Sequence, residues 1–213
     1  MFIVATKPEH MSKHIHTILC LGDSYTIGEG VPLHQSFPYK TVQMLRKEGF
    51  GFHAPEVVAQ TGWTSFELAD HLIHQELEAN YDFVTLLIGV NDQYRDREME
   101  DFADDFEFLL KKAIGLCVAH EKQVFAISIP DWGVTPFAKG KNTGKIAEQI
   151  DSFNSTASLL AAKYNVAWLD ITTDHRKVGH EPENLVADKL HPSATIHQAW
   201  AQLLKESIIS RIR

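Results

Sequence analysis

A serine that follows an apolar run is the first candidate for chemistry in this sequence. The run 18–21 has the length and composition of a buried strand, and Gly22 lets the backbone turn sharply after it. Ser24 is then expected at the carboxyl end of a strand, just before a helix, where its hydroxyl can point into a crevice and neighbouring amides can face the same space. Such a serine could act as a nucleophile. Gly-Asp-Ser alone could equally be a turn with an Asx or serine cap.

Three later segments also contain candidate residues. Two of these segments follow apolar runs, and the third lies near the end of the chain. Gly62 follows the run 57–59, and Asn91 follows the run 83–88 within Gly-Val-Asn-Asp. Asp188 and His191 stand three residues apart, directly before a proline. Each feature also has an ordinary structural interpretation: the glycine could end a strand, the asparagine could cap a turn, and the last pair could be a loop acid and a helix-start histidine.

Together the four segments resemble the ordered blocks of the SGNH (GDSL-type) hydrolase family. These blocks are Gly-Asp-Ser early in the chain, a lone glycine, Gly-x-Asn-Asp, and Asp-x-x-His close to the end. The resemblance covers residues 18–193, and four blocks in the right order are much more specific than any one of them. No Gly-x-Ser-x-Gly elbow occurs in the sequence, which disfavours the ordinary α/β-hydrolase fold.

The resemblance implies a role for each matched residue. Ser24 would be the nucleophile of an acyl transfer, His191 the base that takes its proton, and Asp188 the carboxylate that holds the imidazole tautomer. The backbone N–H groups of Ser24 and Gly62 and the side-chain amide of Asn91 would form the oxyanion hole. The expected activity is hydrolysis of a carboxylic ester through an acyl-enzyme, of the lipase, lysophospholipase or acetylesterase type, without a cofactor.

Two other classes of function compete with this hypothesis. A metal-dependent phosphoesterase could use the Gly-Asp and Gly-x-Asn-Asp segments with His191 as a ligand. It needs an Asp-x-His near the first strand and further histidines in glycine-linked pairs, which the sequence lacks. A non-catalytic acyl- or carbohydrate-binding module on the same scaffold would be expected to have lost Ser24 or His191, and both are present. Activity that resists chelators would separate the hydrolase from the metal enzyme.

Aromatic residues near the matched blocks predict an apolar acyl pocket. Some adjoin the blocks themselves and others lie in the loop 130–144, which contains three glycines and two prolines. Polar neighbours after Asn91 could hydrogen-bond the alcohol portion of a substrate. Equally, the polar residues could lie on the surface and the aromatic side chains could pack in the hydrophobic core. The candidate substrate contacts are Tyr25, Trp63, Tyr94, Arg95, Trp132 and Phe137.

The composition limits the expected partners, metals and disulfides. With a net charge of −8 and no Lys/Arg cluster longer than a pair, the chain is not expected to bind nucleic acid or an anionic membrane. The 12 histidines are dispersed, and His14-x-His16 lacks a Cys or carboxylate companion at metal-site spacing, so no structural metal is predicted. Cys20, in the first apolar run, and Cys117, in an expected amphipathic helix, are interpreted as buried, reduced thiols.

Apolar runs alternate with amphipathic stretches along the chain, which predicts an α/β fold. The combination favours a three-layer α/β/α doubly wound sandwich with a five-stranded parallel sheet in the flavodoxin-like order 2-1-3-4-5. The switch point of that order would bring Ser24 and Asn91 together, with Gly62 beside them. The expected strands are 18–22, 55–60, 83–88, 124–129 and 166–170, and the expected helices are 37–49, 64–80, 98–121, 145–164 and 193–213.

The length favours one domain over 15–213, preceded by an N-terminal extension over 1–14. The apolar start of the chain is shorter than a signal-peptide core and lacks a basic region before it, and no run reaches the ~20 residues of a membrane span. A cytoplasmic location is therefore expected. The expected partner is a small-molecule ester, and the expected assembly a monomer or small homo-oligomer. The blocks do not distinguish among acyl esters, thioesters, acetylated sugars and lysophospholipids.

Overall fold

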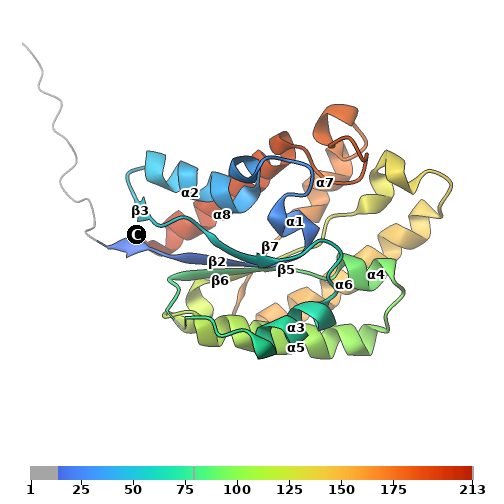
Figure 1. Cartoon of the computed structure of the whole chain (residues 1–213). Coiled ribbons are helices and arrows are strands. Elements are labelled where there is room, and N and C mark those ends of the chain that lie inside the picture. Colours follow the sequence, from blue (N-terminus) through green and yellow to red (C-terminus); the bar gives the residue numbers. More distant parts are fainter. Residues whose placement is uncertain (1–13, 79, 213) are drawn as a thin grey trace, which may run out of the picture.

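A parallel β-sheet with helices on both faces forms the centre of the computed structural model, which describes residues 14–78 and 80–212 (Figure 1). Its strands are short apolar runs, as expected where helices cover both faces of a sheet. They are β2 (Ile18–Gly22), β4 (Glu56–Ala59), β5 (Phe83–Leu87), β6 (Val124–Ile127) and β7 (Ala167–Leu169). Two shorter strands, β1 (Ile15–His16) and β3 (Gly51–Phe52), form a separate parallel pair that the sequence analysis did not predict.

The strand order is β4-β2-β5-β6-β7, and every neighbouring pair is parallel. Counted along the chain, these five strands have the order 2-1-3-4-5, so the doubly wound topology is confirmed. Gly22 pairs with Leu87 of β5 and with Ala59 of β4. The carboxyl ends of these three neighbouring strands are therefore level, and the residues that follow them meet at one end of the sheet.

Helices pack on the sheet in two layers, with two short helices at its carboxyl edge (Figure 1). One layer contains α2 (Phe37–Lys47), α7 (Thr172–Val178) and α8 (Ala194–Ile212). The other contains α3 (Ser65–His74), α5 (Met99–Leu116) and α6 (Thr143–Lys163). The two short helices, α1 (Ser24–Ile27) and α4 (Val90–Tyr94), directly follow β2 and β5. Large apolar side chains from the sheet and both layers are fully buried, among them Phe37, Phe83, Phe102, Phe106 and Phe125.

Two helices end earlier than the sequence pattern predicted. α3 ends at His74 rather than near Asn80, and acidic residues at 76 and 78 oppose the negative end of the helix dipole there. α5 ends at Leu116 rather than at 121 because backbone pairing with Tyr81 takes over. The Tyr81 N–H donates to the Leu116 carbonyl at 3.1 Å, and the Val118 N–H donates to the Tyr81 carbonyl at 2.9 Å.

The helices α4 and α7 were also missed. α4 has five residues, too few for apolar periodicity to show. For α7 the sequence offered one signal, an aspartate just before the helix. Asp170 accepts hydrogen bonds from the Thr172 and Thr173 amides at 2.8 and 3.1 Å, in the manner of a helix cap.

Both cysteines are buried and outside any disulfide, as predicted, although Cys117 lies just after α5 rather than within it. Burial raises the pKa of the Cys20 thiol to about 12, which keeps it protonated. In the described part of the chain, no helix combines the length and the apolar character that crossing a bilayer requires.

Candidate active site

Ser24 stands at the carboxyl edge of the sheet, as the first residue of α1. Asp23 caps this helix, and its Oδ1 accepts a hydrogen bond from the Tyr25 amide at 2.9 Å. A Cβ at position 22 would overlap the Thr26 hydroxyl and the Leu87 carbonyl oxygen. Gly22 is therefore required because α1 passes close to β5, which is a different reason from the backbone freedom that the sequence analysis assigned to it.

A chain of hydrogen bonds joins Ser24 to His191 and Asp188. Ser24 Oγ lies 2.9 Å from His191 Nε2, and His191 Nδ1 lies 2.6 Å from Asp188 Oδ2. An imidazole whose Nδ1–H donates to the carboxylate has its Nε2 lone pair directed at the serine hydroxyl. The arrangement can therefore transfer the hydroxyl proton to the ring as the oxygen attacks an electrophile.

The loop before α8 fixes the carboxylate of this chain. Asp188 Oδ1 accepts hydrogen bonds from the Leu190 and His191 amides at 2.8 and 3.0 Å. Burial raises the pKa of Asp188, but the hydrogen bonds from the His191 ring and these amides outweigh it and hold the pKa below its ordinary value. Lys189, at φ 64°, lets the loop reverse so that both amides face the same oxygen. The carboxylate is therefore ionised and fixed in position.

The three residues predicted for the oxyanion hole line one cavity. Ser24, Gly62 and Asn91 all contribute to its wall. Gly62 has φ 85°, a backbone conformation that favours glycine. Asn91 Nδ2 donates to the Trp63 carbonyl oxygen at 2.9 Å, which fixes the side chain. A carboxamide has two N–H groups, so this hydrogen bond leaves one for a second acceptor.

The cavity has a volume of about 180 Å³, and aromatic rings form much of its wall. Four of the six candidate substrate contacts line it: Tyr25, Tyr94, Trp132 and Phe137. Trp132 is buried, and its indole N–H donates to Gln93 Oε1 at 2.7 Å, so this wall is rigid. The rings of Tyr94 and Phe137 are partly exposed at the opening. The site is therefore an apolar pocket beside a polar reaction centre.

The other two candidate contacts face elsewhere. The Trp63 ring packs on His71 with a centroid distance of 4.8 Å. The Arg95 guanidinium lies 3.2 Å from a Glu67 carboxylate oxygen and donates to the Gly62 carbonyl. Three further residues line the cavity and were not predicted from the sequence: Thr61, Val90 and Leu190. Each is the immediate neighbour of a matched motif residue, which is the signal that could have identified it.

A buried ionic network holds the helix that carries Asn91. Asp92 is fully buried and accepts hydrogen bonds from the Ser65 amide at 2.8 Å and the Ser65 hydroxyl at 2.6 Å. The Arg97 guanidinium bridges Asp92 and Asp105, at 2.8 Å from each. This network joins α4 to the start of α3 and to α5.

A parallel sheet in the order 2-1-3-4-5, with a hydrogen-bonded serine and histidine at its carboxyl edge, defines a class of hydrolases that differs from the ordinary α/β-hydrolases. The sequence profile of the GDSL-like lipase/acylhydrolase family matches residues 20–199. The chain therefore belongs to this family, and it is a hydrolase that acts on ester bonds.

Solved structures share the fold at low sequence identity. The lipase/acylhydrolase from Enterococcus faecalis is 20% identical, with a TM-score of 0.69 over 92% of this chain and 97% of that chain. The lipase Lip_vut3 from a goat rumen metagenome is 18% identical, with a TM-score of 0.72 over 90% and 97%. The psychrotrophic esterase EstA from Pseudoalteromonas sp. is 16% identical, with a TM-score of 0.69 over 92% and 98%. A comparison with curated protein sequences gave no match.

Proposed function

We propose that this hydrolase cleaves carboxylic esters through an acyl-enzyme formed on Ser24. The observation that carries the proposal is the continuous chain from Ser24 Oγ to His191 and Asp188, with distances of 2.9 and 2.6 Å, at the wall of an apolar cavity. In the first half-reaction the serine oxygen attacks the ester carbonyl carbon while His191 Nε2 takes the hydroxyl proton. His191 then returns this proton to the departing alcohol, and the acyl group remains on the serine.

Water completes the proposed cycle. His191 accepts a proton from a water molecule that attacks the acyl-enzyme, and it returns that proton to Ser24 Oγ as the carboxylic acid leaves. Negative charge on the carbonyl oxygen in both tetrahedral intermediates is stabilised by the Ser24 and Gly62 amides and by the Asn91 carboxamide. The Asp188 carboxylate stabilises the imidazolium that forms in each half-reaction.

The dimensions of the cavity favour a short acyl group. Its 180 Å³ is smaller than the ~300–1,000 Å³ of typical drug-sized ligand pockets. The rings of Tyr25, Trp132 and Phe137 offer apolar contact for such a group, and Tyr94 lies at the opening. Among carboxylic esters we therefore expect the highest kcat/KM on short-chain substrates, with a decrease as the chain outgrows the pocket. A panel of aryl esters of graded acyl length measures this directly.

The hydrogen bonds of His191 favour an ester hydrolase over a metal-dependent phosphoesterase or a non-catalytic binding module. Both ring nitrogens of His191 are engaged, by Ser24 and by Asp188, so the ring is not presented as a metal ligand of a phosphoesterase. A binding module would have no need of a serine whose hydroxyl is aligned with an imidazole. Ester hydrolysis that persists after treatment with a chelator is the corresponding expectation.

Covalent labelling tests the nucleophile. EstA has been obtained inhibited by monoethylphosphonate, and for this chain we expect one fluorophosphonate adduct, on Ser24, detected by mass spectrometry of the intact protein and its peptides. Ser24→Ala should abolish both labelling and ester hydrolysis without loss of the fold. Ser193→Ala, two residues after His191, is the matched control and should label like the unmodified chain. An adduct on another residue, or an active Ser24→Ala variant, would refute the proposal.

A further inference from the structure

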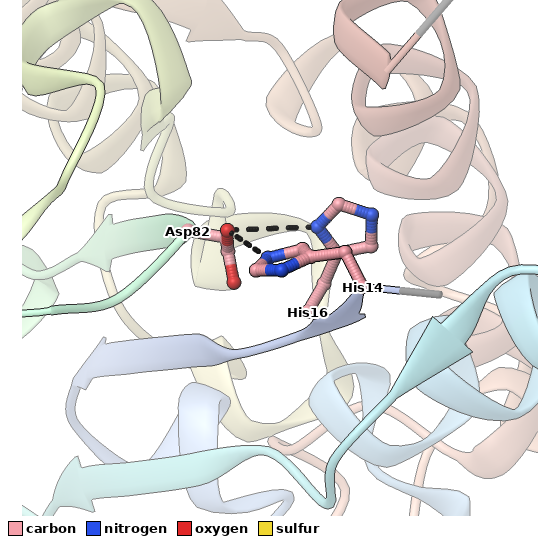
Figure 2. Close-up of side chains that lie close together, drawn as sticks. All are labelled: His14, His16 and Asp82. Atoms are coloured by element: carbon pink, nitrogen blue, oxygen red, sulfur yellow. Dashed lines mark hydrogen bonds and ion pairs between the residues drawn. The ribbon is translucent and has the colours of Figure 1, made fainter. Parts of the chain in front are cut away.

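A second group of polar side chains lies at the opposite edge of the sheet from Ser24. His14 directly precedes β1, His16 is the last residue of β1, and Asp82 directly precedes β5 (Figure 2). Residues two apart on a strand project to the same side, and Ile15 between the histidines is exposed on the other. Figure 2 shows both imidazole rings beside the Asp82 carboxylate. Asp82 is distant from His14-x-His16 in the chain, so nothing in the sequence indicated that a carboxylate lies beside these histidines.

We propose that His14, His16 and Asp82 bind one divalent transition metal ion, with Zn²⁺ as the preferred ion. Two imidazole nitrogens and one carboxylate oxygen are a donor set that suits zinc, and a water molecule would supply the fourth ligand. Of the residues that the structure describes, these three form the one group of His, Cys, Asp or Glu whose ligand atoms lie close enough together to hold a metal ion.

The distances fit such a site. His14 Nε2 lies 2.7 Å and His16 Nδ1 lies 3.6 Å from Asp82 Oδ1, and all three ligand atoms lie within 4.8 Å of one another. In a tetrahedral zinc site with bonds of about 2.0–2.1 Å, neighbouring ligand atoms are about 3.3 Å apart. One of the two measured separations from Asp82 Oδ1 is shorter than this value and the other is longer. Small side-chain movements would therefore place all three atoms around a common centre.

The burial of His16 gives a second, independent indication of a ligand. The residue is only 9% exposed, and within the described part of the chain neither ring nitrogen has a hydrogen-bond partner. Its 3.6 Å separation from Asp82 is too long for a hydrogen bond. Buried polar atoms without a partner are uncommon in folded proteins. A metal ion between the ring and the carboxylate would supply the missing partner.

The carboxylate is oriented as metal ligands commonly are. Asp82 Oδ2 accepts hydrogen bonds from the Thr17 amide at 2.8 Å and the Thr17 hydroxyl at 3.1 Å, which turns Oδ1 toward the histidines. The same two hydrogen bonds hold the carboxylate in the orientation that a metal ion between it and the histidines would need.

The position of the site indicates a structural effect rather than a catalytic one. Thr17 and Asp82 directly precede β2 and β5, whereas Ser24 follows Asp23 beyond the other end of β2. The metal would link β1 to the amino-terminal end of β5 on the side of the sheet away from the cavity. We therefore expect bound Zn²⁺ to raise the melting temperature and to leave kcat unchanged.

The test is a Zn²⁺ titration of the full chain after removal of metals with a chelator. We expect one Zn²⁺ bound per chain by calorimetry, a visible ligand-field spectrum with Co²⁺ in its place, and a higher melting temperature. His14→Ala and Asp82→Asn should weaken Zn²⁺ binding by about 100-fold or more and abolish the Zn²⁺-dependent rise in melting temperature. The side chain of His14 is 58% exposed, so its removal should leave the metal-free fold and the activity intact.

Two further variants control for the other histidines. His74→Ala removes an exposed imidazole that lies 3.7 Å from Asp70 and belongs to no three-ligand group among the described residues, and it should bind Zn²⁺ like the unmodified chain. His191→Ala removes the histidine beside Ser24 and should also retain the site. Absence of saturable Zn²⁺ binding would overturn the proposal and leave His14 and Asp82 as an ion pair alone. Binding that survives in His14→Ala and Asp82→Asn but is lost in His191→Ala would overturn it as well.

Discussion

The Asn91 carboxamide has two N–H groups, and each has a different role in the proposed mechanism. Its Nδ2 donates to the Trp63 carbonyl oxygen at 2.9 Å, and the residue lines the cavity beside Ser24. The first contact positions the side chain, and the second N–H is available for charge that develops only in the transition state. Groups of this kind affect kcat more than they affect ground-state binding.

Substitution of Asn91 tests this division of roles. Asn91→Ala should lower kcat by about 10²–10³ with little change in KM, because the lost hydrogen bond is strongest in the transition state. Labelling of Ser24 by a fluorophosphonate should still occur, but more slowly. Steady-state kinetics and labelling rates on the purified variant provide the measurement. A change dominated by KM would mean that Asn91 binds the ground-state substrate, and the proposed oxyanion hole would then be wrong.

For single residues, the sequence predicted which residues lie near the site better than it predicted where their side chains point. Ser24, Gly62 and Asn91 line one cavity because strand order and register bring the ends of β2, β4 and β5 together. Apolar runs revealed the strands, and the common doubly wound order of five strands predicted their arrangement. Trp63 and Arg95 also adjoin these motifs, yet their side chains pack on His71 and Glu67. Proximity along the chain does not specify the direction of a side chain in an irregular loop, so these contacts could not be predicted.

At the level of elements, long periodic segments were predictable and local endings were not. The five strands and the helices α2, α3, α5, α6 and α8 follow from apolar runs and amphipathic spacing. The end of α5 depends instead on the pairing of Leu116 and Val118 with Tyr81, which lies 35 residues before Leu116. The approach of His14 and Asp82 is equally non-local, which is why the metal-site hypothesis required the structure.

The network around Arg97 makes a testable prediction about how α4 is held. Arg97→Met leaves the fully buried Asp92 carboxylate without its cation, so the free energy of unfolding should fall by about 3–5 kcal/mol. The activity should also decrease, because α4 carries Asn91. Urea denaturation and ester hydrolysis measured on the same preparation would show both effects.

Arg95→Met is the matched control, two residues earlier in the chain. The side chains of Arg95 and Glu67 are 47% and 38% exposed, and an exposed ion pair contributes about 1 kcal/mol or less. The control should therefore change the free energy of unfolding much less than Arg97→Met. Equal destabilisation by the two substitutions would show that burial of Asp92 is not what makes Arg97 important.

For the molecule as a whole, two buried histidines contribute to the loss of stability in acid. Burial lowers the pKa of His197 to about 3, with further lowering by electrostatic interaction with Lys40 and His191. Burial also lowers the pKa of His175 to about 4, although Asp131 acts in the opposite direction. Both rings pack against Trp200, with centroid distances of 5.3 and 6.4 Å, in the layer formed by α2, α7 and α8.

These lowered pKa values predict that the folded state loses stability as the pH falls below about 6.5, the ordinary histidine value. In the unfolded chain these histidines bind protons in that range, whereas in the folded chain they stay neutral until about pH 4 and about pH 3. The free energy of unfolding therefore decreases from pH 6.5 to pH 4. Below these folded-state pKa values the two histidines cause no further decrease.

The substitution His197→Asn isolates the contribution of one ring. Asparagine places an oxygen near the position of Nδ1, which accepts a hydrogen bond from the Phe37 amide at 3.3 Å, but it cannot take up a proton. The loss of unfolding free energy between pH 7 and pH 4.5 should be smaller in this variant by roughly 2–3 kcal/mol. Urea denaturation at the two pH values measures the difference, and His74→Asn, at an exposed site, should behave like the unmodified chain. Parallel pH dependences for His197→Asn and the unmodified chain would show that acid sensitivity arises from other groups.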